Sequence, residues 1–214
     1  MQAYMKSTMP YRGVPTPLMR TRVRAIFAAH PLATFEEWRD TVLALWRQAG
    51  YREERYAAIG LASWPKYRAF QTLDALPLFE EMISTGAWWD YVDSLASRNI
   101  GELLRHYPKE MKPVLRGWAV SGDMWKRRSA ILAQLNFKSE TDLRLLYACI
   151  RPSLQPAPES AEFFLRKAIG WALRQYARID PGEVKRYVEK NAAQMSGLTR
   201  REALKHVSLK QVSV

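Results

Sequence analysis

The sequence is poor in the residue types that build disulfides and metal sites. It contains a single cysteine, Cys149, and three histidines, His30, His106 and His206. A single cysteine excludes an internal disulfide and favours a reducing compartment. The histidines lack the spacing of metal ligands, so no structural zinc site is expected. Cys149, in the apolar segment Leu-Leu-Tyr-Ala-Cys-Ile, is expected to be buried and inert.

Long apolar runs and phosphate-binding loops are also missing. No segment approaches the roughly 18 apolar residues of a membrane span, and residues 1–17 have no signal-peptide core. No Gly-rich phosphate loop and no Gly-x-Ser-x-Gly elbow occurs, which argues against nucleotide hydrolysis and serine-esterase chemistry. The length favours one domain, residues 1–214. We therefore expect a cytoplasmic, single-domain protein without membrane contact, metal or nucleotide cofactor.

Positive charge is abundant and unevenly distributed. Lys and Arg number 33 against 21 Asp and Glu, a net charge of +12. Residues 1–104 carry a net charge of +1 (12 basic, 11 acidic), and residues 105–214 carry +11 (21 basic, 10 acidic). Arg outnumbers Lys 22 to 11, and guanidinium groups suit bidentate contact with phosphate. This balance is typical of a polyanion-binding protein, although a solvated basic surface has the same composition.

Helix signals run along the whole chain. Ala and Leu together number 49 against 19 Val and Ile, which favours helix over strand. Helix starts are predicted by Thr16-Pro17, Asp180-Pro181 and the capping-box pairs Thr34/Glu37 and Thr199/Glu202. Gly50 and Gly86 are placed to end helices, and the Pro-rich segment 151–159 predicts a loop. No convincing alternating strand pattern is present, so the predicted fold class is all-α.

A repeat of helix pairs organises these helices. Pairs of a small and an aliphatic residue recur at Ala58-Ile59, Ser94-Leu95, Ala130-Ile131, Ala168-Ile169 and Ala203-Leu204, with spacings of 36, 36, 38 and 35 residues. Each is preceded by another expected helix, over 35–48, 76–85, 113–120, 141–150 and 182–190. This period indicates an α-solenoid. We predict a HEAT-like α-α superhelix with a concave, basic face that binds a polyanion.

Chemical groups gather on adjacent stripes of the second helix of each pair. Positions five and one before, and three after, the small residue lie four apart and share a helix face. Successive repeats place Glu53, Trp89, Trp125, Phe163 and Leu198 at the first of these positions, and Ala57, Asp93, Ser129, Lys167 and Glu202 at the second. The neighbouring stripe contains Arg128, Arg166 and Arg201. An acid in a basic, aromatic trough would repel phosphate, so Asp93 is the most informative candidate.

The segment Trp88-Trp89-Asp90-Tyr91-Val92-Asp93 resembles the WWDxVD motif of the AlkD-type DNA alkylation repair glycosylases. Similar segments occur in the same order along almost the whole chain, at 4–6, 13–17, 124–132, 167–174 and 198–203. Members of that family are bacterial and archaeal HEAT-like solenoids that remove N3- and N7-alkylated purines from DNA. The resemblance implies a monofunctional DNA glycosylase of base excision repair that acts as a monomer on double-stranded DNA containing alkylated purines.

The resemblance also implies roles for individual residues. Asp93 matches the catalytic carboxylate, Arg128 its backbone-binding partner, Trp89 and Trp171 the aromatic walls, and Tyr4 a tyrosine near the lesion. The DNA contacts that we expect come from Tyr4, Thr16, Arg20, Arg127, Arg166, Lys167, Arg174, Arg201 and Lys205.

One carboxylate is sufficient for this chemistry. An N3- or N7-alkylated purine is cationic, so it leaves as a neutral base without a general acid. The sugar becomes oxocarbenium-like as the bond breaks, and an ionised carboxylate beside it stabilises that charge and positions water. Indole faces attract the cationic base and the developing sugar cation. No amine stands out as a lyase nucleophile.

Plainer interpretations remain open. Asp93 and Arg128 also fit an ordinary ion pair on a helix surface, and Trp89 and Trp171 also fit the core, as expected for Trp88, Trp118 and Trp125. Arg127, Arg166 and Arg201 fit a solvated surface, and Glu202 fits a capping acid. The alternative functions are a non-catalytic solenoid that binds damaged or branched DNA and a solenoid that binds protein.

Overall fold

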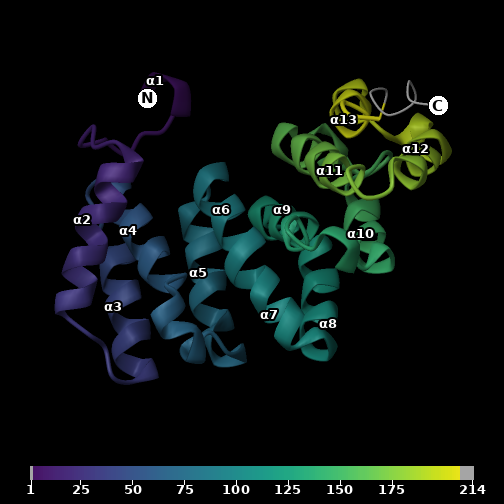
Figure 1. Cartoon of the computed structure of the whole chain (residues 1–214). Coiled ribbons are helices and arrows are strands. Elements are labelled where there is room, and N and C mark those ends of the chain that lie inside the picture. Colours follow the sequence, from purple (N-terminus) through teal and green to yellow (C-terminus); the bar gives the residue numbers. More distant parts are fainter. Residues whose placement is uncertain (1, 208–214) are drawn as a thin grey trace, which may run out of the picture. The chain divides into compact units, whose positions relative to one another are not determined.

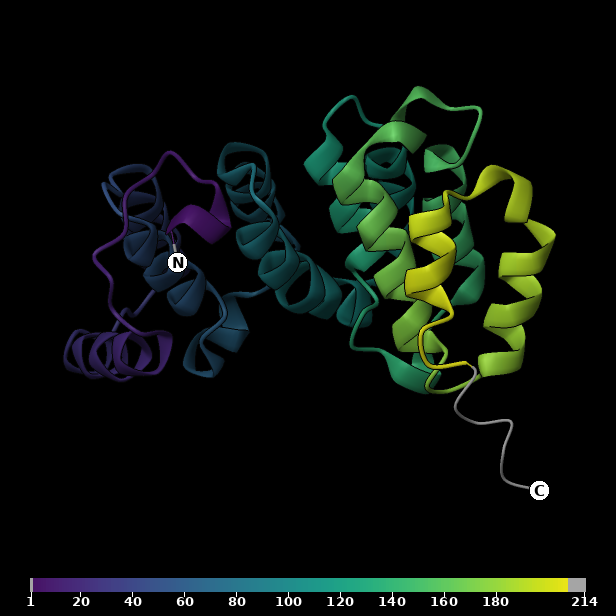
Figure 2. The same ribbon diagram turned by 90° about the horizontal axis from the view of Figure 1, so that it is seen from above.

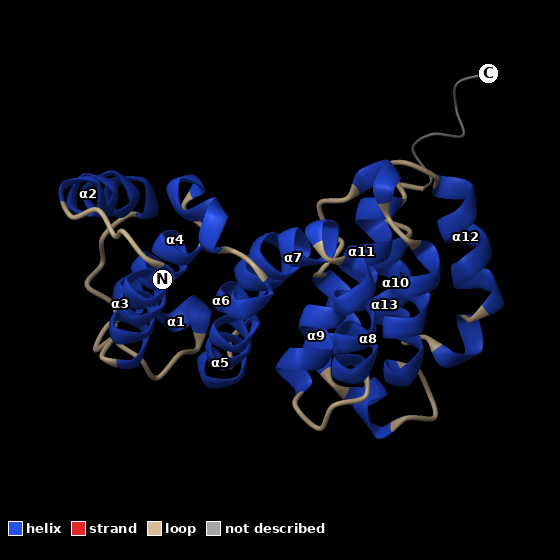
Figure 3. Ribbon diagram, turned by 90° about the horizontal axis from the view of Figure 1, so that it is seen from below, coloured by secondary structure: helices blue, strands red, loops and turns tan. Residues whose placement is uncertain are grey.

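A computed structural model describes residues 2–207, with side chains from Tyr4 onward, and this part of the chain contains helices and loops but no strand (Figures 1 and 3). The helices fall into two compact units, residues 1–82 and 83–214. The expectation of a single domain stays a prediction.

In the first unit, α3 (Phe35–Arg47) and α4 (Arg52–Ala62) pack against each other, and α2 (Thr16–Ala29) buries little of its surface. The unit also contains α1 (Gln2–Met5), the 3₁₀ segments η1 (Pro65–Phe70) and η2 (Leu73–Ala75), and the start of α5 (Leu76–Gly86). Trp38, Val42 and Trp46 form one apolar stripe of α3, and α3 packs against α4, where Ala58 and Leu61 are also buried. Helix α2 buries only Met19.

The second unit continues the pairs. It contains α6 (Trp89–Leu95), the π-helical segment η3 (Ala96–Ile100), α7 (Gly101–His106), α8 (Pro108–Ala119), α9 (Met124–Leu132), η4 (Lys138–Glu140), α10 (Leu143–Ile150), η5 (Arg151–Ser153), η6 (Pro158–Ala161), α11 (Phe163–Tyr176), α12 (Pro181–Lys190), η7 (Ala192–Gln194) and α13 (Gly197–Ala203). Helices α6, η3 and α7 join without a break, since Leu95, Ala96, Ile100 and Gly101 all have helical dihedral angles.

The predicted repeat of helix pairs is confirmed. Four of the small-plus-aliphatic pairs lie on α4, α6, α9 and α11, and in the fifth pair Ala203 ends α13 and Leu204 is its C-cap. All members of the pairs are buried except Ser94 and Leu204, which are half-buried. Within the second unit, α6 contacts α9, α9 contacts α11, and α11 contacts α13, so the second helices follow one another (Figure 2). The all-α class and the helical repeat are therefore correct, whereas the basic concave face stays a prediction.

The approach of α13 to α11 depends on Gly170. A Cβ atom at this position would lie 2.5 Å from Cβ of Glu202 and 3.1 Å from the carbonyl oxygen of Thr199. The hydroxyl of Thr199 also donates to the carbonyl oxygen of Arg166, at 3.3 Å. Since only glycine leaves this space open, the small residue lets the backbone of α11 touch the side chains of the next repeat.

Most predicted boundaries are close, and the differences have local causes. Helix α8 begins at Pro108 and not at Pro113, because Pro108 already occupies the first turn, where a missing N–H costs nothing. Gly86 is the last residue of α5, and the left-handed residue that ends this helix is Ala87 (φ 42°). The Pro-rich segment is a loop that includes the short turns η5 and η6.

Two of the predicted caps are confirmed and two are not. The side chains of Thr34 and Asp180 accept the N–H groups of Glu37 and Glu183, as N-caps do. Thr16 is the first residue of α2, and Pro15 is its cap. The Thr199/Glu202 capping box was wrong, because Ser196 caps α13 and accepts from the N–H of Thr199. The carboxylate of Glu202 has other partners, described below.

Candidate active site

Asp93 lies on α6 immediately before a π-helical turn. Its residue surface is 8% exposed. Its carbonyl oxygen accepts from the hydroxyl of Ser97, at 2.7 Å, within the π-helical segment η3. Such segments insert one extra residue into a helix and are frequent at functional sites. Neither the π-turn nor the role of Ser97 was predicted, because the sequence through 89–106 has no Pro or Gly cluster to signal a break.

The carboxylate of Asp93 is held by Arg128 of α9. Nε donates to Oδ1 at 2.6 Å and Nη2 donates to Oδ2 at 2.8 Å, so the pair is bidentate. Arg128 is 4% exposed, and its Nη1 donates to the carbonyl oxygen of Phe164 on α11. Three consecutive second helices therefore meet at one guanidinium group. The sequence motif brought Asp93 and Arg128 together as candidates, and the structure places them in direct contact.

Burial and ion pairing act on Asp93 in opposite directions. Desolvation raises the pKa of its carboxyl group, the hydrogen bonds and positive charge of Arg128 lower it, and the net result is a pKa above the ordinary value. The nearby charge of Asp90 adds to the increase. A carboxylate in this setting is poorly hydrated, which strengthens its interaction with any cation that reaches it.

An aromatic cluster packs at the N-terminal ends of the same three helices. It consists of Trp88, the residue before α6, Trp125 in the first turn of α9, and Phe164 in the first turn of α11. The ring centroids are 6.5 Å apart for Trp88 and Trp125, 5.8 Å for Trp88 and Phe164, and 5.1 Å for Trp125 and Phe164. Trp88 and Trp125 therefore pack between repeats, as expected.

The two tryptophans expected as aromatic walls lie on neighbouring helices of this unit. Trp89 precedes Asp93 by one turn of α6, and Trp171 follows Phe164 by two turns of α11. Both are half-buried, so neither is a fully enclosed core residue. Their contact with a substrate stays a prediction.

Arg127 and its neighbour Arg128 have unrelated partners. Arg127 is 7% exposed, and its guanidinium group donates to the carbonyl oxygens of Ser121 and Ala119 at 2.5 and 3.0 Å. Nη2 also donates to Glu159 at 2.7 Å. These contacts attach the loop before α9 to the segment before α11. Arg127 therefore holds these loops together, and its expected DNA contact stays a prediction.

The other cationic residues of this unit that we expect to contact DNA differ in exposure and in ion pairing. Arg201 and Lys205 are exposed, whereas Arg166 is half-buried and its Nε has no partner among the described residues. Lys167 and Arg174 of α11 both donate to Glu202 of α13, at 2.8 and 2.7 Å. Glu202 thus forms ion pairs with two of the residues that we expect to contact DNA.

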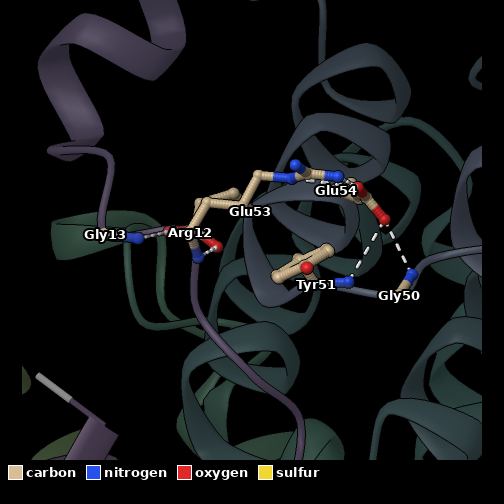
Figure 4. A network of polar contacts seen from close by, with 6 residues as sticks. All are labelled: Arg12, Gly13, Gly50, Tyr51, Glu53 and Glu54. Carbon is tan, nitrogen blue, oxygen red and sulfur yellow. Dashed lines mark hydrogen bonds and ion pairs between the residues drawn. The ribbon is translucent and has the colours of Figure 1, made fainter.

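In the first unit, the expected DNA-contacting residues are exposed. Tyr4 is 76% exposed, and Thr16 and Arg20 are also on the surface. A second buried acid lies nearby, Glu53, whose carboxylate accepts the backbone N–H groups of Arg12 and Gly13 at 3.0 and 2.9 Å (Figure 4). Glu53 fastens the segment before α2 to α4. Glu53 occupies the repeat position that holds Trp89, Trp125 and Phe163 in later repeats, and this was the only feature of the sequence that singled it out.

No group of His, Cys, Asp and Glu residues within residues 2–207 could hold a metal ion. Cys149 is fully buried, and desolvation raises the pKa of its thiol to about 12, as an inert thiol requires. None of the helices described here is both long and apolar enough for a transmembrane segment.

The comparisons with known proteins agree with the geometry. Residues 1–207 match the model of the family described as DNA alkylation repair enzyme. The chain belongs to this family. It is also similar in structure to a predicted DNA alkylation repair enzyme from Enterococcus faecalis, with a TM-score of 0.84, 27% sequence identity, and coverage of 100% of this chain and 94% of the other. Curated proteins give no significant match. This DNA alkylation repair protein therefore acts in the repair of alkylated DNA, with DNA as its partner.

Proposed function

We propose that this repair protein is a monofunctional DNA glycosylase that hydrolyses the N-glycosidic bond of cationic N3- and N7-alkylated purines in duplex DNA. The observation that carries the proposal is the buried Asp93 carboxylate, held bidentately by Arg128. A carboxylate that cannot rotate and is poorly hydrated is suited to stabilise an oxocarbenium-like sugar, because its field needs no reorganisation during the reaction.

Three further groups have roles in this proposal. Arg128 orients the carboxylate and holds the phosphate that flanks the lesion. Trp89 and Trp171 offer indole faces to the cationic base and sugar, an attraction of about 0.5–2 kcal/mol each. No general acid is needed, since the departing base is neutral. The abasic strand is then left for other enzymes.

The cationic residues contact the phosphates of the duplex. Exposed Arg20, Arg201 and Lys205, half-buried Arg166, and the Glu202-paired Lys167 and Arg174 are the proposed phosphate ligands, together with Thr16 and Tyr4. Phosphate contacts position the protein without reading sequence. This requirement suits an enzyme that must find a lesion in any sequence.

Base release from methylated DNA tests the proposal. Duplex DNA methylated with a simple alkylating agent is incubated with the protein, and free 7-methylguanine and 3-methyladenine are measured by mass spectrometry. We expect release by the wild type and a loss of about 10²–10³-fold in Asp93→Asn, which has the shape of Asp93 but no charge. Asp40→Asn, an exposed site on α3, is the matched control and should keep full activity.

A second function is favoured by the same ion pair. Both oxygens of Asp93 are already occupied by Arg128, as in a purely structural ion pair, which suits a non-catalytic protein that binds damaged or branched DNA. In that case the wild type binds such DNA but frees no base under conditions where a control glycosylase does. DNA binding that is unaffected by Asp93→Asn, with base release abolished, supports the glycosylase.

A further inference from the structure

Glu202 holds an unusual place among the cations of the second unit. It occupies the position of the repeat that holds Asp93 on α6 and Lys167 on α11, so it lies on the proposed DNA-facing stripe. Oε1 accepts from Nζ of Lys167 at 2.8 Å, and Oε2 accepts from Nη1 of Arg174 at 2.7 Å. One acid therefore pairs with two cations that lie two turns apart on α11.

The fold makes room for this acid. The β-carbon of Glu202 lies over Gly170, between Lys167 and Arg174, at a distance that any other residue at 170 would close. The side chains of Glu202 and Arg174 are 21% exposed and that of Lys167 is 39% exposed. The three groups are therefore ordered by packing and yet remain within reach of a ligand.

The geometry points to Glu202 as a residue that limits the affinity for duplex DNA by competing with phosphate for Lys167 and Arg174. This inference rests on the proposed function, in which these two cations contact the duplex. A phosphate must displace the carboxylate before it gains either contact. The hydrogen bond from Lys167 lowers the pKa of Glu202, so the competitor keeps its charge across the neutral range.

Salt dependence measures this competition directly. The affinity of the full chain for an undamaged duplex is determined by fluorescence anisotropy at several salt concentrations. Each added phosphate contact steepens the plot of log K against log salt concentration by about 0.9. We expect Glu202→Gln to bind more tightly at low salt, with a slope steeper by about 0.9–1.8 than that of the wild type.

A matched variant removes the effect of net charge alone. Glu189→Gln makes the same charge change on α12, at an exposed residue paired only weakly with Lys185, at 4.0 Å. It should leave the slope unchanged. A double-mutant comparison adds a second readout: Lys167→Gln should reduce the slope more in the Glu202→Gln background than in the wild type, because Lys167 is freed there.

These outcomes decide the inference. Equal slopes for Glu202→Gln and Glu189→Gln, or weaker binding by Glu202→Gln with an intact fold, would overturn it. Glu202→Ala carries the same expectation if the Gln variant does not fold. Failure of both neutral variants to fold would also overturn it, since Glu202 would then serve helix packing alone. Wild-type base release is measured separately, so failure of the proposed function is distinguishable from failure of this inference.

Discussion

Arg128 reaches across 35 positions of the sequence to place its guanidinium plane against the carboxylate of Asp93. The contact joins α6 to α9, and the third nitrogen of Arg128 extends it to the start of α11 through the carbonyl oxygen of Phe164. One side chain thus links three consecutive repeats at the candidate site. The effect of this contact on the free energy of unfolding and its effect on base release can be measured separately.

Removal of Arg128 should destabilise the fold. Arg128→Ala leaves Asp93 buried without its counter-charge, and breaking a buried pair in this way costs about 3–5 kcal/mol. Urea denaturation followed by circular dichroism measures this loss in the free energy of unfolding. Arg186→Ala, which removes an exposed pair with Glu183, should leave the free energy of unfolding nearly unchanged. Similar costs for the two variants would contradict the assignment of a buried pair.

The pH dependence of base release should reveal the environment of Asp93. Burial raises the pKa of Asp93 above the ordinary value of about 3.9. The carboxylate therefore becomes protonated, and loses its charge, at a higher pH than an exposed aspartate. The single-turnover rate, corrected for spontaneous depurination, should therefore fall on the acid side above pH 3.9. A rate that stays level down to that pH would count against an essential ionised Asp93.

Gly170→Ala should separate α13 from α11. The new methyl group meets Cβ of Glu202 at 2.5 Å and the backbone of Thr199 at 3.1 Å, so packing must shift. Overpacking of this kind costs about 1–3 kcal/mol in unfolding free energy. Gly60→Ala on α4 is the matched control, because no atom lies within 4 Å of its added Cβ. There alanine should stabilise the helix by up to about 1 kcal/mol, so thermal denaturation should move in opposite directions for the two variants.

The assignment of Arg127 to loop packing can be distinguished from a role on DNA. Arg127→Met leaves several backbone carbonyls and Glu159 without their donor, so the unfolding free energy should fall while the salt dependence of DNA binding stays unchanged. Exposed Arg201→Met should do the reverse, with a slope shallower by about 0.9 and normal stability. A shallower slope in Arg127→Met with an intact fold would instead support the predicted DNA contact of Arg127.

Local signals in the sequence were sufficient for the helices and their repeat. Thr34 and Asp180 cap where expected, because an N-cap needs only a short acceptor side chain and the N–H three residues later. Thr199 was a wrong choice because Ser196, three residues earlier, is an equally good acceptor and is the residue that caps α13. The choice between two adequate caps depended on how α13 packs on α11.

The sequence by itself determined the all-helical repeat and the excess of positive charge, since spacing and composition encode them. A short motif also identified Asp93 and Arg128 as candidate site residues. Only the tertiary structure decided what each charge touches. Neighbouring residues on a helix point about 100° apart, so Arg127 turns to loop carbonyls, Arg128 turns to Asp93, and Glu202 leaves its expected cap for two cations of the previous repeat. The partners of Arg128 and Glu202 lie on helices 28–36 residues away in the sequence, and no local pattern specifies which face of a helix its neighbour will cover.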